Sequence, residues 1–372
     1  MFRPNRFTKY FLLFILFVIS TERIISQTED VKLTQLRQQI ALNYMKPTPH
    51  LALAKYYWQK GDRLQAFYIS EYARRARFPE SVFNQAFQTS FGGTAQAGAG
   101  KQIGGTWLDD SKKDAEPRLD NNKQVAAIFD KAAELQKQGR LAEAEEMFIK
   151  VAEIAPDSVH IQSWVGRFFF KVKADNKRAL EYYLNAYFLD PHAYETEFVE
   201  SRIRKINWDT AAFKYSQLIK SGIQPAKILD ESNPTVVLMA LEQMTAQWKG
   251  AYLKPVLDCM KHDDETVRWQ ATAAIMKNVN RSFDETLQAL LQETDLRQRG
   301  LAAYIAVHLW KQDSFPLLRI MLREEAQLLR FDAISALIAG GGEEGFKIIA
   351  EHRRNESDLT LKQMLDKSLK RP

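Results

Sequence analysis

A spacing of 31 residues recurs in the C-terminal half of the chain and limits what the chain can fold into. Each copy places an arginine three residues before an alanine. The three copies are Arg268 with Ala271, Arg299 with Ala302, and Arg330 with Ala333. A fixed period of about 20–50 residues is typical of proteins built from stacked units, in which each unit buries its apolar face against its neighbours. The spacing therefore predicts an all-α, helical-hairpin solenoid.

The same register continues outward in weaker copies, at Val237 with Ala240 and at Leu361 with Met364. We therefore expect three to five repeats over residues 233–372. The central copy, residues 263–275, resembles the short HEAT-like repeats of bacterial and phycobilisome-lyase-type proteins. That resemblance implies pairs of antiparallel helices and says little about function.

A second period, of 35 residues, is found over residues 123–205, where helices are expected at 125–138, 141–155, 159–172 and 177–189. Ala144, Phe148 and Pro156 recur as Ala179, Tyr183 and Pro191. This pattern resembles the tetratricopeptide repeat, which implies a small residue where two helices cross, an aromatic residue beneath it and a terminal proline. Gly166 lies one residue out of register, which predicts a longer turn at residues 173–175.

The remaining segments are less regular. Residues 33–91 resemble a degenerate tetratricopeptide hairpin, with Ser70 at the aromatic position. Residues 92–122 are rich in glycine and lack periodicity, which predicts a flexible linker. Two further helices are expected at 193–205 and 210–221, and residues 206–232 are interpreted as a junction before the 31-residue repeats.

The N-terminal segment is typical of an export signal. Arg3, Arg6 and Lys9 precede an apolar stretch at residues 10–19, and cleavage is expected after residue 20 or after residue 26. The apolar stretch is about half of what a membrane span needs, so an uncleaved inner-membrane anchor is the alternative to a periplasmic or secreted protein. Removing the three cations lowers the net charge from +6 to +3. Export and this modest charge argue against a nucleic-acid partner.

No catalytic or metal-binding pattern stands out. The glycines of the linker follow neither the phosphate-loop nor the dinucleotide spacing, and no expected strand precedes them. The six histidines lack the i, i+3 or i, i+4 spacing of a metal site, and the single cysteine, Cys259, falls in an apolar helical stretch. We therefore expect no enzymatic activity, no cofactor and no metal.

In the tetratricopeptide family the first helix of each pair lines a concave groove. Carried over to this chain, the groove would be mildly basic with aromatic edges, which suits an extended peptide with a carboxylate or acidic side chains. The residues concerned are Lys55, Trp58, Gln136, Lys137, His160, Arg167 and Lys171. The alternative is an ordinary solvated helix face.

The arginines of the 31-residue period admit two interpretations as well. They could form a basic stripe, or each could pair within its helix with an aspartate four residues earlier, Asp264 for Arg268 and Asp295 for Arg299. The second, structural interpretation is favoured.

The expected function is that of an exported, non-enzymatic scaffold or adaptor that binds partner proteins through concave solenoid surfaces. One alternative is an accessory protein of an enzyme or of a lyase-like cofactor-attachment system. Another is an assembly factor held at the membrane by an uncleaved signal.

Overall fold

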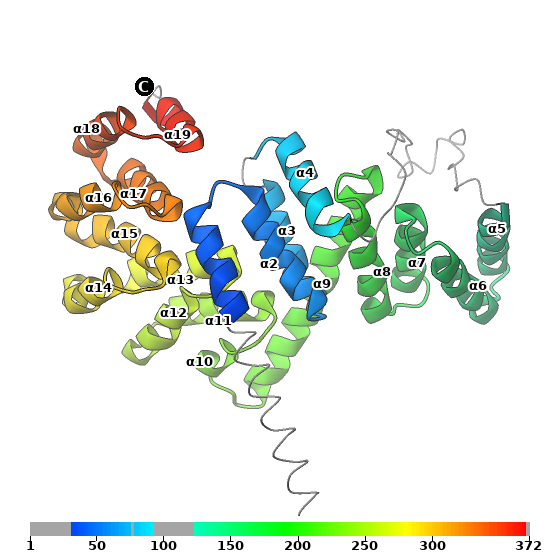
Figure 1. The fold of residues 1–372 in the computed structure, drawn as a ribbon. Coiled ribbons are helices and arrows are strands. Elements are labelled where there is room, and N and C mark those ends of the chain that lie inside the picture. The colour runs from blue at the N-terminus through cyan, green and yellow to red at the C-terminus, as the bar shows by residue number, and fades with distance from the viewer. Residues whose placement is uncertain (1–30, 76–77, 93–122, 370–372) are drawn as a thin grey trace, which may run out of the picture. The chain divides into compact units, whose positions relative to one another are not determined.

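The computed structural model describes residues 31–75, 78–92 and 123–369, and the path of the chain is shown in Figure 1. The export-like segment and the glycine-rich segment after Gly92 lie outside these residues. Within the described ranges every regular element is a helix, and neighbouring helices pack as antiparallel pairs. The expected all-α, helical-hairpin fold class is confirmed.

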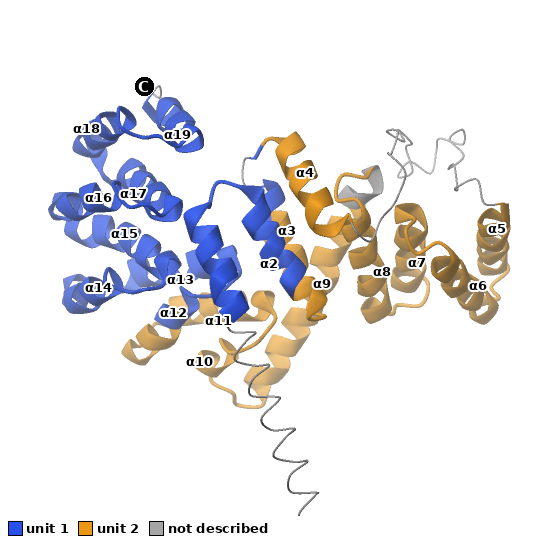
Figure 2. Ribbon diagram, in the orientation of Figure 1, with its two compact units in different colours: residues 1–56, 72–78, 257–372 blue, residues 57–71, 79–256 orange. Residues whose placement is uncertain are grey.

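The described residues divide into two compact units (Figure 2). Unit 1 contains residues 31–56, 72–78 and 257–369, and unit 2 contains residues 57–71, 79–92 and 123–256. Helices α2 (Pro47–Gln59) and α3 (Arg63–Arg75) each contribute residues to both units. The chain therefore enters both units within its first described helices.

Most of unit 1 is formed by the 31-residue repeats. The paired helices are α13 (Glu265–Asn278) with α14 (Asp284–Leu290), α15 (Leu296–Trp310) with α16 (Phe315–Met321), and α17 (Gln327–Gly340) with α18 (Gly342–Arg353), followed by α19 (Leu359–Leu369). The 3-10 turns Arg281–Phe283 and Lys311–Ser314 join helices within pairs. Ala271, Ala302 and Ala333 are all fully buried. Small side chains at these positions let successive first helices approach closely.

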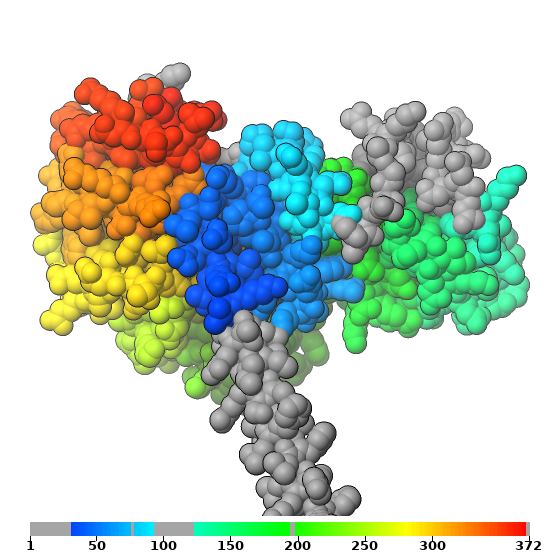
Figure 3. Space-filling model, in the orientation of Figure 1, coloured from blue at the N-terminus to red at the C-terminus, as the bar shows by residue number. Residues whose placement is uncertain are grey.

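The N-terminal segment of unit 1 packs on these repeats. A helix over residues 31–42 and the turn after it contact residues at the start of α13 and on α17, and the space-filling view shows the dark blue segment beside the yellow and orange repeats (Figure 3). Tyr44, for example, contacts Phe331 with ring centroids 5.1 Å apart. The repeats therefore do not present all of their surface to solvent.

Unit 2 contains the 35-residue pairs. They are α5 (Lys123–Lys137) with α6 (Leu141–Ile154) and α7 (Val159–Lys171) with α8 (Asn176–Leu189), followed by α9 (Tyr194–Lys220), α10 (Pro225–Ile228) and α11 (Pro234–Ala246), then a 3-10 turn, Gly250–Tyr252, and the first residues of α12 (Leu253–Cys259). Ala144, Phe148, Ala179 and Tyr183 are at most 1% exposed. Pro156 is exposed in the turn after α6, and Pro191 is buried in the turn after α8.

Gly166 shows how closely α7 and α8 approach each other. A Cβ atom at this position would lie 2.8 Å from a ring carbon of Tyr183, so no larger residue fits without movement. The turn after α7 is longer than the turn after α5, as the shifted register predicts. Ala174 takes a left-handed conformation there, with φ of 51°.

One expectation about the junction is wrong. Helix α9 runs without a break over residues 194–220, where two shorter helices were expected. The sequence contains no glycine or proline between residues 193 and 221, so nothing ends the first helix. Asn207 lies in the middle of α9 and is 2% exposed, and its amide nitrogen donates hydrogen bonds to Tyr68 and Thr235 at 2.7 Å each.

The residues of α3 that belong to unit 2 pack on helices far along the chain. The Tyr187 hydroxyl of α8 lies 3.1 Å from the Ser70 hydroxyl, and the rings of Phe67 and Tyr187 have centroids 4.8 Å apart. Arg204 of α9 pairs with the buried Glu71 at 3.2 Å. These residues are 117 or more positions apart, and no local pattern in the sequence indicates the contact.

Candidate peptide-binding surface

Helix α7 presents a stripe of cationic and aromatic side chains. His160, Trp164, Arg167 and Lys171 occur at positions i, i+4, i+7 and i+11, which fall on one face of a helix. The Arg167 guanidinium lies 5.0 Å from the centroid of the Trp164 ring, and Phe129 of α5 lies 5.8 Å from the rings of both His160 and Trp164. The fold therefore brings together three of the expected groove residues around a tryptophan that sequence analysis did not select.

Helix α9 contributes a second arginine that is held in the same way. Arg202 lies 4.8 Å from the ring centroid of Phe198, one turn earlier on α9, and 5.1 Å from that of Phe170 on α7. Within the described ranges no carboxylate pairs with Arg202 or with Arg167. An arginine placed against aromatic faces keeps its charge and most of its hydrogen-bond donors available for a ligand.

Tyr183 lies where both arginines influence it. Burial raises the pKa of its hydroxyl, and the charges of Arg202 and Arg167 act in the opposite direction. The hydroxyl therefore stays protonated, and it has no hydrogen-bond partner among the described residues. The same is true of the Arg202 Nε atom. Tyr183 is 0% exposed and the Arg202 Nε atom is also buried, so neither atom is accessible to a ligand at the surface.

The chemistry of this surface favours an anionic ligand. Guanidinium groups are donors only, and a carboxylate accepts several hydrogen bonds from them, with two parallel bonds from one arginine. The aromatic faces of Trp164 and Phe198 supply apolar surface beside the charge. We call the exposed faces of α7 and α9 that carry these residues the arginine–aromatic surface.

The other expected groove residues lie elsewhere. Gln136 and Lys137 are at the C-terminal end of α5, where Gln136 is half-buried and Lys137 is exposed. Trp58 packs on Phe188 of α8, with ring centroids 4.4 Å apart, and Arg63 covers its other side at 4.6 Å. Lys55 is half-buried and belongs to unit 1.

Arg202, Trp164 and Phe198 were missed because sequence analysis considered charges one at a time. The usable signal is the spacing of an aromatic residue and an arginine on one helix face. Trp164 precedes Arg167 by three residues, and Phe198 precedes Arg202 by four. The segment of Phe198 and Arg202 was set aside because it matched neither repeat.

The expected partners of the 31-residue-period arginines are wrong. Asp264 accepts hydrogen bonds from the amides of Thr266 and Val267 at the start of α13, and Asp295 caps α15 in the same way. An aspartate directly before a helix satisfies backbone donors that have no other partner, and this use takes precedence over pairing one turn later.

The arginines instead pair with glutamates. Arg268 pairs with Glu265, Arg299 lies 3.5 Å from Glu324, and Arg330 lies 3.0 Å from Glu356. The last two glutamates belong to the turns that precede the next first helix. Arg299 and Arg330 therefore join successive repeats and Arg268 pairs within its own helix, which agrees with the structural interpretation over that of a ligand-binding stripe.

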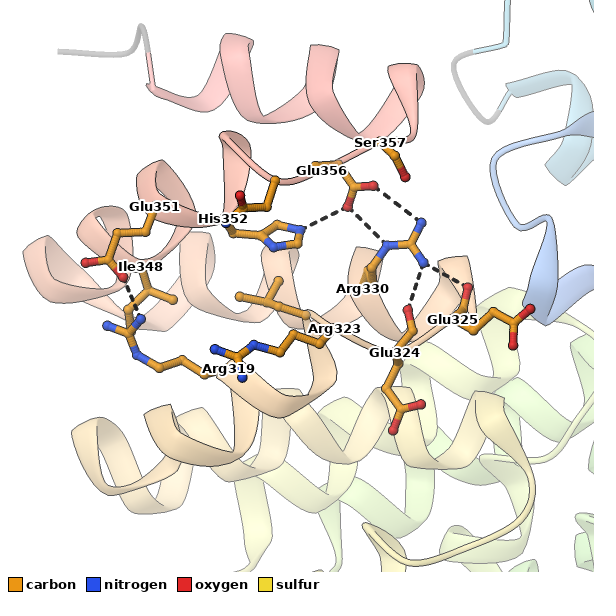
Figure 4. Close-up of a pocket in the computed structure, with 12 residues that line it drawn as sticks. Arg319, Arg323, Glu324, Glu325, Arg330, Ile348, Glu351, His352, Glu356 and Ser357 are labelled. Carbon is orange, nitrogen blue, oxygen red and sulfur yellow. Dashed lines mark hydrogen bonds and ion pairs between the residues drawn. The ribbon is translucent and has the colours of Figure 1, made fainter.

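A cavity of about 570 Å³ lies in unit 1 between the loop before α17 and the end of α18 (Figure 4). Five of its charged or titratable side chains pair with one another. Arg319 and Glu351 are 2.6 Å apart, and Glu356 contacts both Arg330 and the His352 ring, at 3.0 and 2.9 Å. Because these charges already have partners, the cavity offers a charged ligand less than the arginine–aromatic surface does.

No group of three or more metal-ligating side chains is found among the described residues, and no helix in those ranges is long and apolar enough to cross a membrane. No family model, no curated protein and no solved structure matches the chain.

Proposed function

We propose that this protein is a non-enzymatic adaptor that binds an extended, acidic segment of a partner protein on the arginine–aromatic surface. One observation carries the proposal. Arg167 and Arg202 are held on aromatic rings, and no described carboxylate pairs with them. Their guanidinium groups are therefore oriented by the rings, and a carboxylate can bind them without breaking an existing ion pair.

The repeat families belong to the same proposal. The buried small and aromatic residues at Ala144 and Phe148, and again at Ala179 and Tyr183, support tetratricopeptide units in unit 2. The buried alanines at 31-residue spacing support HEAT-like repeats in unit 1. Both families serve mainly as binding scaffolds, which is why we infer an adaptor and not an enzyme.

We also propose export, on the basis of the charged and apolar start of the sequence. The N-terminal sequence of the protein recovered from cell fractions tests it. A start at residue 21 or 27 in a periplasmic or secreted fraction would support cleavage and export. An intact N-terminus in the membrane fraction would support the anchored alternative.

The binding proposal can be tested with a defined acidic probe. Fluorescein-labelled octaglutamate is titrated with the full chain, and fluorescence anisotropy is followed at low and at high salt. We expect binding that weakens with salt and is lost when Arg167 and Arg202 are both changed to Glu. A matched control changes Lys150 and Lys177, which are exposed on the second helices α6 and α8, to Glu. If both double variants bind as the unchanged chain does, the surface is not the binding site.

The partner itself is sought by affinity capture from envelope extracts. The bait is the mature chain, compared with a variant in which Arg167, Lys171 and Arg202 are changed to Glu. We expect a partner that is retained by the first bait and lost from the second. Equal recovery on both baits would contradict the assignment of these three cations.

A further inference from the structure

The first described segment of the chain has the pattern of a helix that binds in a groove. Arg37, Ile40, Ala41 and Tyr44 occur at positions i, i+3, i+4 and i+7. The last three are between 1% and 5% exposed, although the segment lies at the surface of unit 1. We call residues 31–46, which comprise the helix over 31–42 and the turn after it, the strap.

Arg37 and Tyr44 anchor the strap on the start of α13. The Nε and Nη2 atoms of Arg37 donate to the two carboxylate oxygens of Asp263, both at 2.7 Å. The Tyr44 hydroxyl donates to Glu265 at 3.2 Å. Asp263 and Glu265 are at most 9% exposed, so these are largely desolvated contacts.

The C-terminal end of the strap, at Tyr44 and Met45, also contacts α17. The backbone amide of Met45 donates to the Gln327 side-chain oxygen at 2.7 Å, and the Tyr44 ring packs on Phe331. Gln327 follows Glu265 by 62 residues, so the two residues occupy the same position in repeats that are two apart. The strap therefore crosses the first helices of the repeats and contacts equivalent positions on α13 and α17.

Each repeat side chain that the strap contacts also has a partner within the repeats. Asp263 also forms an ion pair with Arg297 at 2.7 Å. Glu265 also pairs with Arg268 and accepts a hydrogen bond from the Trp269 indole. The Gln327 amide nitrogen donates to Asp358 at 2.7 Å. If the strap leaves, none of these groups loses all of its partners. Undocking therefore avoids the large penalty of an unpaired buried charge.

We propose that the starts of α13 and α17 form a helix-binding surface, which the strap occupies and from which a partner helix of the same pattern can displace it. Such a helix carries an arginine, two small or apolar residues, and a tyrosine at positions i, i+3, i+4 and i+7. The surface recognises the arginine through Asp263 and the tyrosine through Glu265 and Phe331. This site is separate from the arginine–aromatic surface, and its test does not depend on the function proposed above.

The carboxyl group of Asp332 is buried near Tyr44 of the strap. Burial raises the pKa of the Asp332 carboxyl and the charge of Arg268 acts in the opposite direction, while the charge of Asp332 helps to raise the pKa of Tyr44 in the strap and of Tyr72 in α3. Asp332 packs against Gly300 of α15 on its other side. The strap therefore docks beside a carboxyl whose ionisation burial makes unfavourable.

The test uses a labelled peptide in competition with the strap. Fluorescein-labelled peptide 31–46 is titrated with the full chain, with an Arg37→Glu chain and with a Lys46→Glu chain. Lys46 is exposed on the strap and bonds only to Asn43 in the structure, so its variant controls for the charge change. We expect at least about tenfold tighter peptide binding by the Arg37→Glu chain than by the other two, because only that strap is weakened while the peptide keeps its arginine.

Hydrogen–deuterium exchange distinguishes a displaceable strap from part of the core. We expect Arg37→Glu to speed exchange in residues 31–46 and to leave α13 and α17 unchanged. The proposal is overturned if the peptide binds all three chains equally. It is also overturned if exchange in the strap, α13 and α17 rises together, because the strap is then an inseparable part of the repeat core.

Discussion

His50 makes unit 1 sensitive to acid. Its ring is 3% exposed, packs among the rings of Tyr44, Tyr72 and Phe78, and donates from Nε2 to the Tyr44 carbonyl oxygen at 2.9 Å. Burial lowers the pKa of this imidazole from its ordinary value of 6.5 to about 4, with a smaller contribution from the charge of Arg268 and an opposing one from the bond to Tyr44. The folded protein therefore holds His50 in its neutral form.

The sign of the effect follows from the two pKa values. Between pH 6.5 and pH 4 the unfolded chain protonates His50 and the folded chain does not, so the unfolded state gains protons and stability falls as the pH falls. The full difference of about 2.5 pH units corresponds to about 3 kcal/mol in the free energy of unfolding, reached near pH 4. Above pH 6.5 His50 contributes no pH dependence.

The substitution His50→Gln isolates the contribution of His50 protonation to stability. Glutamine can still donate a hydrogen bond to the Tyr44 carbonyl, but it does not titrate. Urea unfolding of both proteins is measured at pH 7.5, 6, 5 and 4, and hydrogen exchange of α13–α17 assigns the transition to unit 1. We expect the stability difference between the unchanged protein and the variant to shift by about 3 kcal/mol towards the variant between pH 7.5 and 4. Asp332 titrates in the opposite direction but is present in both proteins, so it cancels. A difference that stays constant with pH would refute the reasoning.

Three further predictions concern stability. Gly166→Ala should lower the free energy of unfolding of unit 2 by about 1–2 kcal/mol, because overpacking against the Tyr183 ring outweighs the gain in helix propensity. Urea unfolding measures this change. The control is Gly250→Ala, which should be neutral because no atom lies within 4 Å of the new Cβ. Asp332→Asn should stabilise unit 1 increasingly as the pH rises, by at most about 1.4 kcal/mol per pH unit. The reason is that burial raises the pKa of this carboxyl and makes its ionisation costly in the folded state. If the free energy of unfolding changes with pH equally in both proteins, the prediction is contradicted. Arg330→Gln should cost about 1–3 kcal/mol of stability, because it removes an ion pair with the buried Glu356. Arg299→Gln should cost under about 1 kcal/mol, because its contact with Glu324 is longer and more exposed. Thermal unfolding of the two variants compares the two losses.

The helices of the 35-residue pairs could be predicted closely from the sequence. The expected ranges 125–138 and 141–155 correspond to α5 and α6, and the ends agree within two residues. Apolar residues at helical spacing and a glycine turn determine these limits locally. Gly139 takes φ of 77° in that turn, a conformation that other residues rarely adopt. Periodicity and turn chemistry are short-range properties, and a single sequence displays them.

The long-range contacts could not be predicted in this way. Arg37 and Asp263 are 226 residues apart, and both stand in stretches that resemble ordinary solvated helix ends. The position of Asp264 was a different kind of error, because the signal was present. An aspartate immediately before a helix is typical of a cap, and a pairing rule for helix interiors was applied at a helix start.

Arginines serve opposite purposes in the two units, and their surroundings explain why. In unit 1, Arg268 and Arg330 pair with glutamates that are at most 9% exposed, and removing either charge would leave a buried carboxylate without its partner. Such arginines cannot move to a ligand without that cost, so Arg268 stabilises its own helix and Arg330 holds successive repeats together. In unit 2, Arg167 and Arg202 rest on aromatic rings, which orient the guanidinium but leave its hydrogen-bond donors unused. A carboxylate that approaches them replaces water and breaks no existing ion pair. The absence of a competing carboxylate within the described ranges, more than the positive charge itself, is what makes the arginine–aromatic surface suitable for recognition.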